Sequence, residues 1–307
     1  MSLGKGRTVS DAPLSATPSP AVDLHHPSVA RVYDFLLGGS AYWALDRSFA
    51  NRMLDHFPEF RDIARANRMF VDRAVRHLLK LGVRQFIDIG SGVLSSDNTH
   101  EIADKVVPDA KVVYVDNDPV AVAHAEILLD RKGDPDRHVV VNADLRHPDE
   151  LWQQVSNACV LDLEKPVAVL MFSVLHSLPP EEGDRDPAAR LMTRYRDLIS
   201  PGSYLGISHL TAEGVPEDLP PKLAVLKRLC DDDWHDGRAY CRSRSAVTAL
   251  LGDFDLVWPG MVWAPEWNPE ESANPASSVH FPEPSHSVVW AGVGRKVAED
   301  DTGKKRP

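Results

Sequence analysis

The residues best suited to chemistry lie in one stretch of the chain, from Arg84 to Asp118. It begins with the apolar run FIDIG, turns at GSG, and reaches a second apolar run, VVYVD, that ends in an acid. Glycines let the backbone turn tightly and approach a ligand. A carboxylate at the tip of the second strand accepts hydrogen bonds from a diol, such as two ribose hydroxyls. The stretch therefore predicts a nucleoside-cofactor site on a doubly wound sheet.

The glycine turn itself is Gly90-Ser91-Gly92. A dinucleotide fingerprint would have a third glycine three residues after Gly92, where Ser95 stands. Close packing of helix and strand over a pyrophosphate is therefore not supported. The turn alone is equally compatible with an ordinary connection between a strand and a helix.

Asp116 strengthens the cofactor interpretation. It follows Gly90 at close to the spacing expected of a ribose-binding acid, and Asn117 beside it is assigned to the same site. The alternative for Asp116 is a surface cap on the next helix. Asp118 fits that role better, because it directly precedes Pro119.

A third acid follows the third apolar run, in VVVNADL. Parallel strands deliver their end residues to one edge of a sheet, so Asp144 should lie near the other two strand ends. A hydrogen-bond acceptor beside the apolar Leu145 suits the amino group and the flat face of adenine. The alternative for Asp144 is a helix cap, although Pro148 places the start of that helix a little later.

These strand ends resemble a known group, the class I S-adenosylmethionine-dependent methyltransferases. DIGSG, VDND and NADL match their pattern, with Leu94 in place of the third glycine of the turn. The run VAVLMFSVLHSLP matches their later motif, in which Phe172 and Ser173 would border the methyl donor. The resemblance implies a Rossmann-like sheet of seven strands, mostly parallel, with an antiparallel edge pair.

More closely, the chain resembles a bacterial family called S-adenosyl methyltransferase. The segments that carry this resemblance are HPSVARVYDFLLGG, ARANRMFVDRAVR, RQFIDIGSG, VVYVDNDPVAVAHA, NADLR, SHLT, PGMVWAPEW and WAGVGRK. They extend over residues 26–296, roughly the whole ordered chain. The resemblance implies S-adenosylmethionine as cofactor and S-adenosylhomocysteine as product, and it implies no particular acceptor.

The segment from Pro27 to Gly82 has a helical pattern and predicts an N-terminal cap. Tyr33 lies on the apolar stripe of the first helix, so it is either a core residue or part of the donor site. Asn67 lies on the stripe of the third helix, where a polar side chain must find a hydrogen-bond partner. It either ties the cap to the sheet or reaches the amino-acid end of the cofactor.

His176 follows the fourth strand and could accept a proton from an acceptor nucleophile. The alternative is a loop histidine with a purely structural hydrogen bond, and the same alternative applies to His209. The other histidines lack metal-ligand spacing with nearby acids or cysteines, so we expect no metal site.

These residues need elements to position them. From Arg84 on, apolar runs alternate with helical patterns, which is typical of a parallel sheet covered on both faces. The expected strands span residues 84–90, 111–117, 138–143, 167–173 and 203–209. Two late runs, 255–262 and 287–293, have no helix between them and predict an antiparallel pair at the edge.

The chain divides into four expected parts. Residues 1–26 are rich in Ser, Pro, Thr and Ala, so we expect a disordered tail. The cap then occupies 27–83, the cofactor-binding domain 84–296, and a flexible charged tail 297–307.

Composition limits the possible partners. The net charge of −11 disfavours a nucleic-acid binder. Three scattered cysteines, no signal-peptide pattern and no membrane-span pattern predict a soluble cytoplasmic protein.

The sequence therefore predicts a methyltransferase that acts on a small molecule and does not bind a membrane. A regulatory protein that binds S-adenosylmethionine or S-adenosylhomocysteine without methyl transfer stays open. An NAD-dependent oxidoreductase is disfavoured by Ser95.

Overall fold

The structure is a computed structural model that describes residues 22–179, 186–234, 239–273 and 279–297. The expected N-terminal tail, except for its last five residues, and all but the first residue of the expected C-terminal tail lie outside these ranges. No helix in the described ranges is both long enough and apolar enough to cross a membrane.

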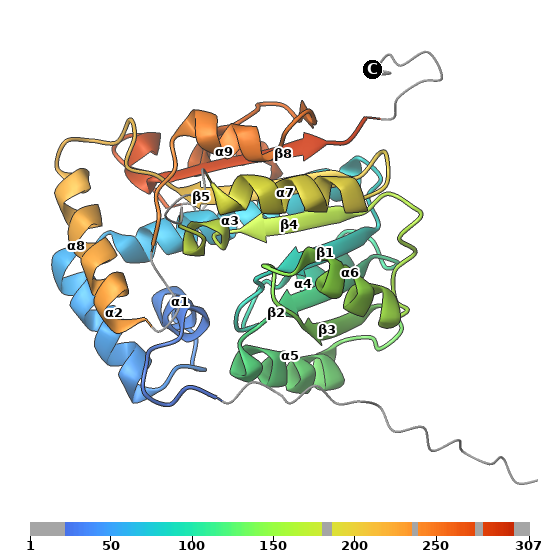
Figure 1. Cartoon of the computed structure of the whole chain (residues 1–307), viewed down its shortest axis with the longest axis horizontal. Helices are drawn as coiled ribbons and strands as arrows, with labels where there is room; N and C mark the ends of the chain where they lie inside the picture. Colours follow the sequence, from blue (N-terminus) through green and yellow to red (C-terminus); the bar gives the residue numbers. More distant parts are fainter. Residues whose placement is uncertain (1–21, 180–185, 235–238, 274–278, 298–307) are drawn as a thin grey trace, which may run out of the picture.

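A mixed sheet forms the centre of the molecule, in the order β3-β2-β1-β4-β5-β8-β6 (Figure 1). The first five strands in the chain are parallel, as expected, and β8 runs antiparallel to β5. The strands are β1 (Gln85–Ile89), β2 (Lys111–Asp116), β3 (His138–Asn142), β4 (Ala168–Phe172), β5 (Tyr204–Leu210) and β8 (Val289–Arg295). Because β1 to β4 are parallel neighbours, their carboxyl ends lie at one edge of the sheet.

The outer antiparallel strand is discontinuous. The single run expected at 255–262 consists of β6 (Asp255–Leu256) and β7 (Val262–Trp263), which pair with different parts of β8. Pro259 has no amide proton for the ladder, and Gly260 turns the backbone with φ at 93°. Within the described ranges, eight strands therefore occupy the seven positions expected of this sheet, and the predicted antiparallel pairing is confirmed.

Helices cover both faces of the sheet. One face packs against α3 (Phe60–Lys80), α4 (Thr99–Asp104) and α5 (Pro119–Lys132). The other packs against α6 (Pro148–Asn157), α7 (Pro187–Leu198) and α9 (Arg244–Leu250). Successive strand residues supply the two faces, because Phe86 belongs to the first apolar cluster and Ile87 to the second. The core is therefore two apolar layers with the sheet between them.

A second group of helices lies beyond the carboxyl end of β4, on the left of Figure 1. It comprises α1 (Val29–Leu37), α2 (Ala44–His56), the start of α3 and α8 (Leu219–Asp233). Val32, Phe49, Met53 and Leu226 are among the buried side chains that hold it together. The expected cap segment supplies three of these helices, whereas α8 comes from the middle of the expected cofactor-binding domain.

Candidate active site

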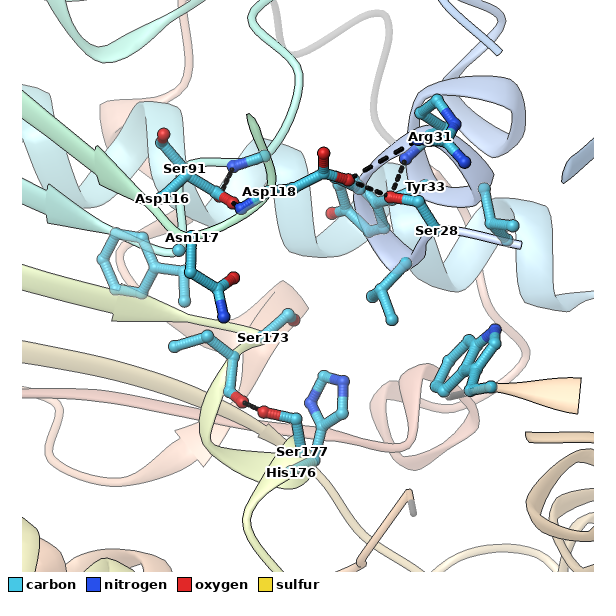
Figure 2. A pocket seen from close by; sticks show the side chains of 18 of the residues that line it. Ser28, Arg31, Tyr33, Ser91, Asp116, Asn117, Asp118, Ser173, His176 and Ser177 are labelled. Atoms are coloured by element: carbon cyan, nitrogen blue, oxygen red, sulfur yellow. Dashed lines mark hydrogen bonds and ion pairs between the residues drawn. The ribbon is translucent and has the colours of Figure 1, made fainter. Parts of the chain in front are cut away.

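A cavity of about 660 Å³ opens at the carboxyl ends of β1 to β4, under α1 and α3 (Figure 2). This volume lies within the range usual for small-molecule sites. All the site residues predicted from the sequence line it: Tyr33, Asn67, Gly90, Ser91, Gly92, Asp116, Asn117, Asp144, Leu145, Phe172, Ser173 and His176. The structure therefore brings together residues from four strand ends and two helices.

The glycine turn is held against β2. The backbone N–H groups of Gly90 and Ser91 both donate to the carbonyl of Val115, at 2.8 and 3.2 Å. Gly90 and Gly92 have φ angles of 71° and 64°, which residues with a Cβ rarely adopt. A Cβ on Gly90 would also lie 2.5 Å from a methyl carbon of Val174. The Ser91 hydroxyl is buried and has no hydrogen-bond partner in the described ranges.

Asp116 is a buried carboxylate held by backbone donors. One oxygen accepts from Gly92 N at 2.7 Å and the other from Asp118 N at 2.9 Å. Burial raises the pKa of Asp116 to about 6, although these bonds act in the opposite direction. Each carboxylate oxygen keeps a second lone pair for a further donor. Asp116 can therefore hold the turn and accept hydrogen bonds from a ligand at the same time.

Asp118 is the helix cap that the sequence predicts, since one of its oxygens accepts from Val120 N at 2.8 Å. Its second oxygen accepts from the Ser28 hydroxyl at 2.5 Å and lies 3.7 Å from an Nη of Arg31 (Figure 2). The start of α1 is thereby attached to the end of β2. Asn117 is exposed and lies between the two acids.

Asp144 does not cap the following helix. The N-cap of α6 is His147, and its side chain makes no capping hydrogen bond. The carboxylate instead accepts two parallel bonds from the Arg146 guanidinium, at 2.6 and 3.0 Å. Burial raises the pKa of Asp144, but the Arg146 bonds outweigh it, so the pKa lies below its usual value. The Leu145 carbonyl accepts from Tyr195 at 2.8 Å, which fixes the apolar wall beside this pair.

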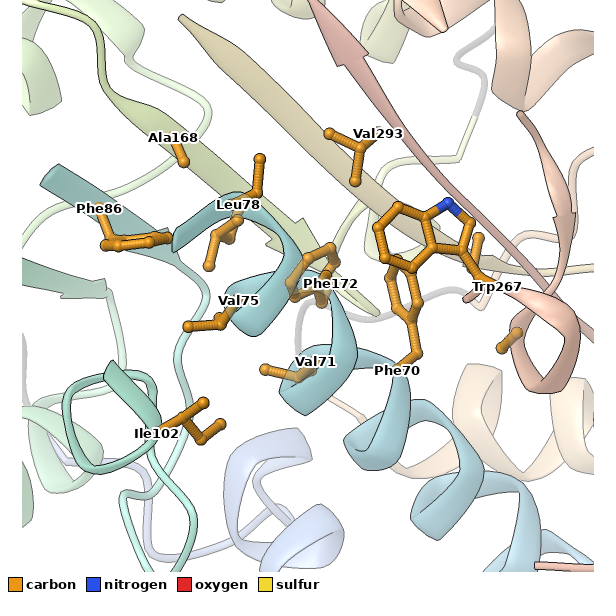
Figure 3. Packing of buried hydrophobic residues seen from close by; sticks show 14 of the residues in the cluster. Phe70, Val71, Val75, Leu78, Phe86, Ile102, Ala168, Phe172, Trp267 and Val293 are labelled. Atoms are coloured by element: carbon orange, nitrogen blue, oxygen red, sulfur yellow. The ribbon is translucent and has the colours of Figure 1, made fainter. Parts of the chain in front are cut away.

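The end of β4 separates the cavity from the core. Phe172 packs edge-on against Phe70, which in turn contacts Trp267 (Figure 3). The next residue, Ser173, has a φ of 52°, and its N–H donates to the Ser208 hydroxyl at 2.9 Å. Left-handed backbone at a residue other than glycine costs free energy and is concentrated at functional sites.

Asn67 ties the cap to the sheet. Its Oδ1 accepts from the Ser208 hydroxyl of β5 at 2.6 Å, and its Nδ2 donates to the Tyr33 hydroxyl at 2.9 Å. Tyr33 then donates to the carbonyl of Ala64 at 3.1 Å. The first interpretation of Asn67, that it ties the cap to the sheet, is thus seen directly. Tyr33 and Asn67 also line the cavity, so the same hydrogen bonds position the part of its wall that α1 and α3 supply.

His176 projects into the cavity from the turn after β4 (Figure 2). Among the described residues neither of its ring nitrogens has a partner, and only Nδ1 is closed off from solvent. Nε2 is therefore the nitrogen available to a ligand. Burial, followed by the charge of Arg242, lowers the pKa of His176 to about 4. The ring is neutral at pH 7 and can act as a proton acceptor.

Sequence reasoning missed the two buried arginines of this region. Arg242 donates to the carbonyls of Leu175 and Leu178, to both oxygens of Asp186 and to His209 Nε2, which fixes the loop that carries His176. Arg31 donates to Asp46 at 2.7 Å and lies over the Trp43 ring. Both are at most 2% exposed. Their partners are distant in sequence, so neither has a local signal.

The hydrogen bond from Arg242 also determines which ring nitrogen of His209 carries the proton. Because Nε2 accepts, the proton resides on Nδ1, which donates to the Leu210 carbonyl at 2.7 Å. Burial, together with the charges of His176 and Arg242, lowers the pKa of His209 to about 3. His209 is thus a histidine with structural hydrogen bonds, which is the alternative that the sequence left open for it.

This buried neutral ring predicts acid sensitivity. Below about pH 6.5 an unfolded His209 takes up a proton that the folded one refuses, so its stabilising contribution is complete above pH 6.5 and is lost as the pH falls. Between pH 7.5 and 5 the wild type should lose on the order of 1–2 kcal/mol more unfolding free energy than His209→Gln. Urea unfolding at both pH values measures this, with the exposed His56→Gln as control. Equal losses in wild type and His209→Gln would contradict the assignment.

Comparisons with known proteins agree with this geometry. The family described as S-adenosyl methyltransferase matches residues 15–297. A crystal structure of a proposed methyltransferase from Thermobifida fusca YX is 35% identical, with a TM-score of 0.78, and covers 92% of this chain and 100% of that one. A DUF574 family protein from Streptomyces avermitilis MA-4680 is 31% identical, with a TM-score of 0.77 and coverages of 88% and 98%. No curated protein matches the chain.

The family match covers nearly the whole chain, and the fold is the one that the resemblance implies. It decides against the nicotinamide cofactor and in favour of S-adenosylmethionine. The chain belongs to the S-adenosyl methyltransferase family and is an S-adenosylmethionine-dependent methyltransferase.

Proposed function

We propose that this protein methylates a small molecule in the cytoplasm and that the predicted residues hold the methyl donor. The observation that carries the proposal is the meeting of all the predicted residues in one cavity at the strand ends. The free thiols of Cys159, Cys230 and Cys241 suit a reducing compartment. The acidic net charge of −11 favours a small acceptor over a nucleic acid.

The residues present fit the donor. Asp116 offers oxygens to the ribose hydroxyls, as carboxylates at this position of doubly wound sheets do. The Asp144 carboxylate and Leu145 offer an acceptor and an apolar surface to the adenine. The methionine end then falls at the Gly90–Gly92 turn, which lines the cavity.

Methyl transfer requires little covalent catalysis from the protein. The donor supplies a methyl group on a positively charged sulfur, which is already activated. The chain's own residues align the nucleophile and exclude water. α1 contributes by closing one side of the cavity, attached through Ser28 to Asp118. His176 Nε2 accepts the proton that the nucleophile releases, because its ring is neutral at pH 7.

Calorimetry with S-adenosylmethionine and S-adenosylhomocysteine tests the donor site. We expect one site per chain for each ligand and no heat of binding with NAD. Labelled methyl transfer to extracted small metabolites tests the acceptor class, and His176→Ala should lower that rate by roughly 10²- to 10⁴-fold with donor affinity retained. Transfer to nucleic acid but not to metabolites would overturn the small-molecule assignment.

A further inference from the structure

The cavity has a second half, beneath the helices that lie beyond the sheet. This half, here called the chamber, is lined by Met53 of α2, Phe60 and Ile63 of α3, Leu226 and Cys230 of α8, and Trp234. Met53, Ile63, Leu226 and Cys230 are each at most 5% exposed. The donor residues all belong to the strand ends, α1 or the middle of α3. The chamber is therefore space that the proposed placement of the donor leaves for something else.

Charged side chains are unevenly distributed around the cavity. Among the described residues, the charged side chains that line it are Asp23, Arg31, Arg68, Asp88, Asp116, Asp118, Asp144 and Arg146, and none of these comes from α2 or α8. Arg31 donates through Nε to Asp46, and its Nη2 is buried without a hydrogen-bond partner in the described ranges. Arg68 donates through Nη2 to the carbonyls of Ser96 and Asp97. In the described part of the chain, α3 is the one chamber helix that adds a charged side chain to the cavity, Arg68, and the six side chains named for the chamber carry no charge.

This division limits what the chamber can accept. Burying an ion without a partner costs several kcal/mol, so neither a carboxylate nor an ammonium group would be stable against these side chains. Aromatic and sulfur-containing walls instead favour flat apolar groups. Two polar side chains lie at the chamber: Trp234, whose buried Nε1 has no hydrogen-bond partner in the described ranges, and His176, whose Nε2 is available at the boundary with the donor half. They suit a molecule with one or two neutral polar groups.

We infer that the methyl acceptor is an uncharged, mostly apolar molecule that presents a neutral hydroxyl to His176 from the chamber. This inference rests on the proposed function and adds the class of the acceptor to it. The acceptor oxygen bonds to the methyl carbon as the carbon–sulfur bond breaks, and that electron pair stays on sulfur. The hydroxyl proton passes to His176 Nε2 and then to solvent. The products are a methyl ether, a neutral thioether and one proton, so charge and atoms balance.

Matched pairs of probes test the inference on the full-length protein saturated with S-adenosylhomocysteine. The first pair is 2-naphthol and 6-hydroxy-2-naphthoate, and the second is 4-propylphenol and tyramine. We expect the uncharged member of each pair to bind at least 10-fold more tightly by calorimetry. Equal affinity, preference for the charged member, or no binding of either would overturn the inference.

Two variants locate the binding in the chamber. Met53→Trp fills it, and the smaller change Leu226→Phe serves if the first fails to fold; either should weaken 2-naphthol at least 10-fold. Affinity for S-adenosylhomocysteine should change less than 2-fold, which also shows that the variant is folded. Ile127→Trp is the control, since Ile127 is exposed on α5. Unchanged naphthol affinity in a folded filled variant contradicts the inference, whereas failure of wild type to bind S-adenosylhomocysteine contradicts the proposed function instead.

Discussion

Replacing Asp116 with alanine is expected to weaken binding of S-adenosylmethionine by about 10- to 100-fold. Hydrogen bonds to a charged group contribute roughly 1.5–3 kcal/mol, and about 1.4 kcal/mol corresponds to a tenfold change in affinity. The variant also removes the acceptor that holds Gly92 N, so the glycine turn loses part of its support. Isothermal calorimetry at pH 7.5 measures the affinity directly.

Asp130→Ala is the matched control, because Asp130 is an exposed acid near the end of α5. It should leave the affinity unchanged. Unchanged affinity in Asp116→Ala itself would show that the ribose lies elsewhere, and the proposed orientation of the donor would be wrong.

The pH dependence of binding gives an independent test of the same carboxylate. The pKa of Asp116 is about 6, so it loses its charge as the pH falls from 7.5 to 5. A neutral carboxyl accepts hydrogen bonds less strongly, so donor affinity should fall in wild type over this range. In Asp116→Ala that pH dependence should disappear. A fall of equal size in the variant would assign the effect to another group.

Gly90→Ala should lower stability by about 2–4 kcal/mol. Left-handed backbone costs roughly 1–2 kcal/mol for a residue with a Cβ, and overpacking against a rigid neighbour costs about 1–3 kcal/mol. The neighbour is Val174, whose branched side chain cannot rotate its methyl groups away from the new Cβ. Urea unfolding measures the change, and calorimetry should show weaker donor binding.

Gly92→Ala is the comparison that separates the two costs. Its φ of 64° imposes a similar backbone cost, but a Cβ there meets only Ala30, at 3.8 Å. It should therefore destabilise less than Gly90→Ala. Combining Gly90→Ala with Val174→Ala should recover part of the difference, as a double-mutant cycle would show. Equal effects of both glycine variants would mean that Val174 moves freely.

Much of the fold could be predicted because it depends on local patterns. Apolar runs such as the one that ends at Asp116 formed the expected strands, and Asp118 before Pro119 began the expected helix. Leu94, in the place of a third glycine, is a buried core residue at 2% exposure, so the turn tolerates it. The break between β6 and β7 was missed, because a short outer strand depends on its partner more than on its own pattern.

The candidate site likewise has residues that the sequence could predict and contacts that it could not. The ends of strands can be recognised in the sequence, so residues from Gly90 to Ser173 could be predicted to hold the donor, and these residues line one cavity. Asn67 could be identified as a polar residue on an apolar stripe, but its partners Ser208 and Tyr33 could not. Hydrogen-bond partners far apart in the chain leave no periodic trace.

The sequence by itself determined the alternation of strands and helices, the cofactor class and the edge of the sheet at which the predicted site residues meet. The alternation and the edge follow from backbone periodicity and from the geometry of parallel strands. The cofactor class follows from the resemblance of the strand-end motifs to a known family. Only the tertiary structure decided that α8 completes the wall of the chamber and that Arg31 and Arg242 are buried. The physical reason is that burial and charge neutralisation depend on which distant segments pack together, and residue spacing does not encode that.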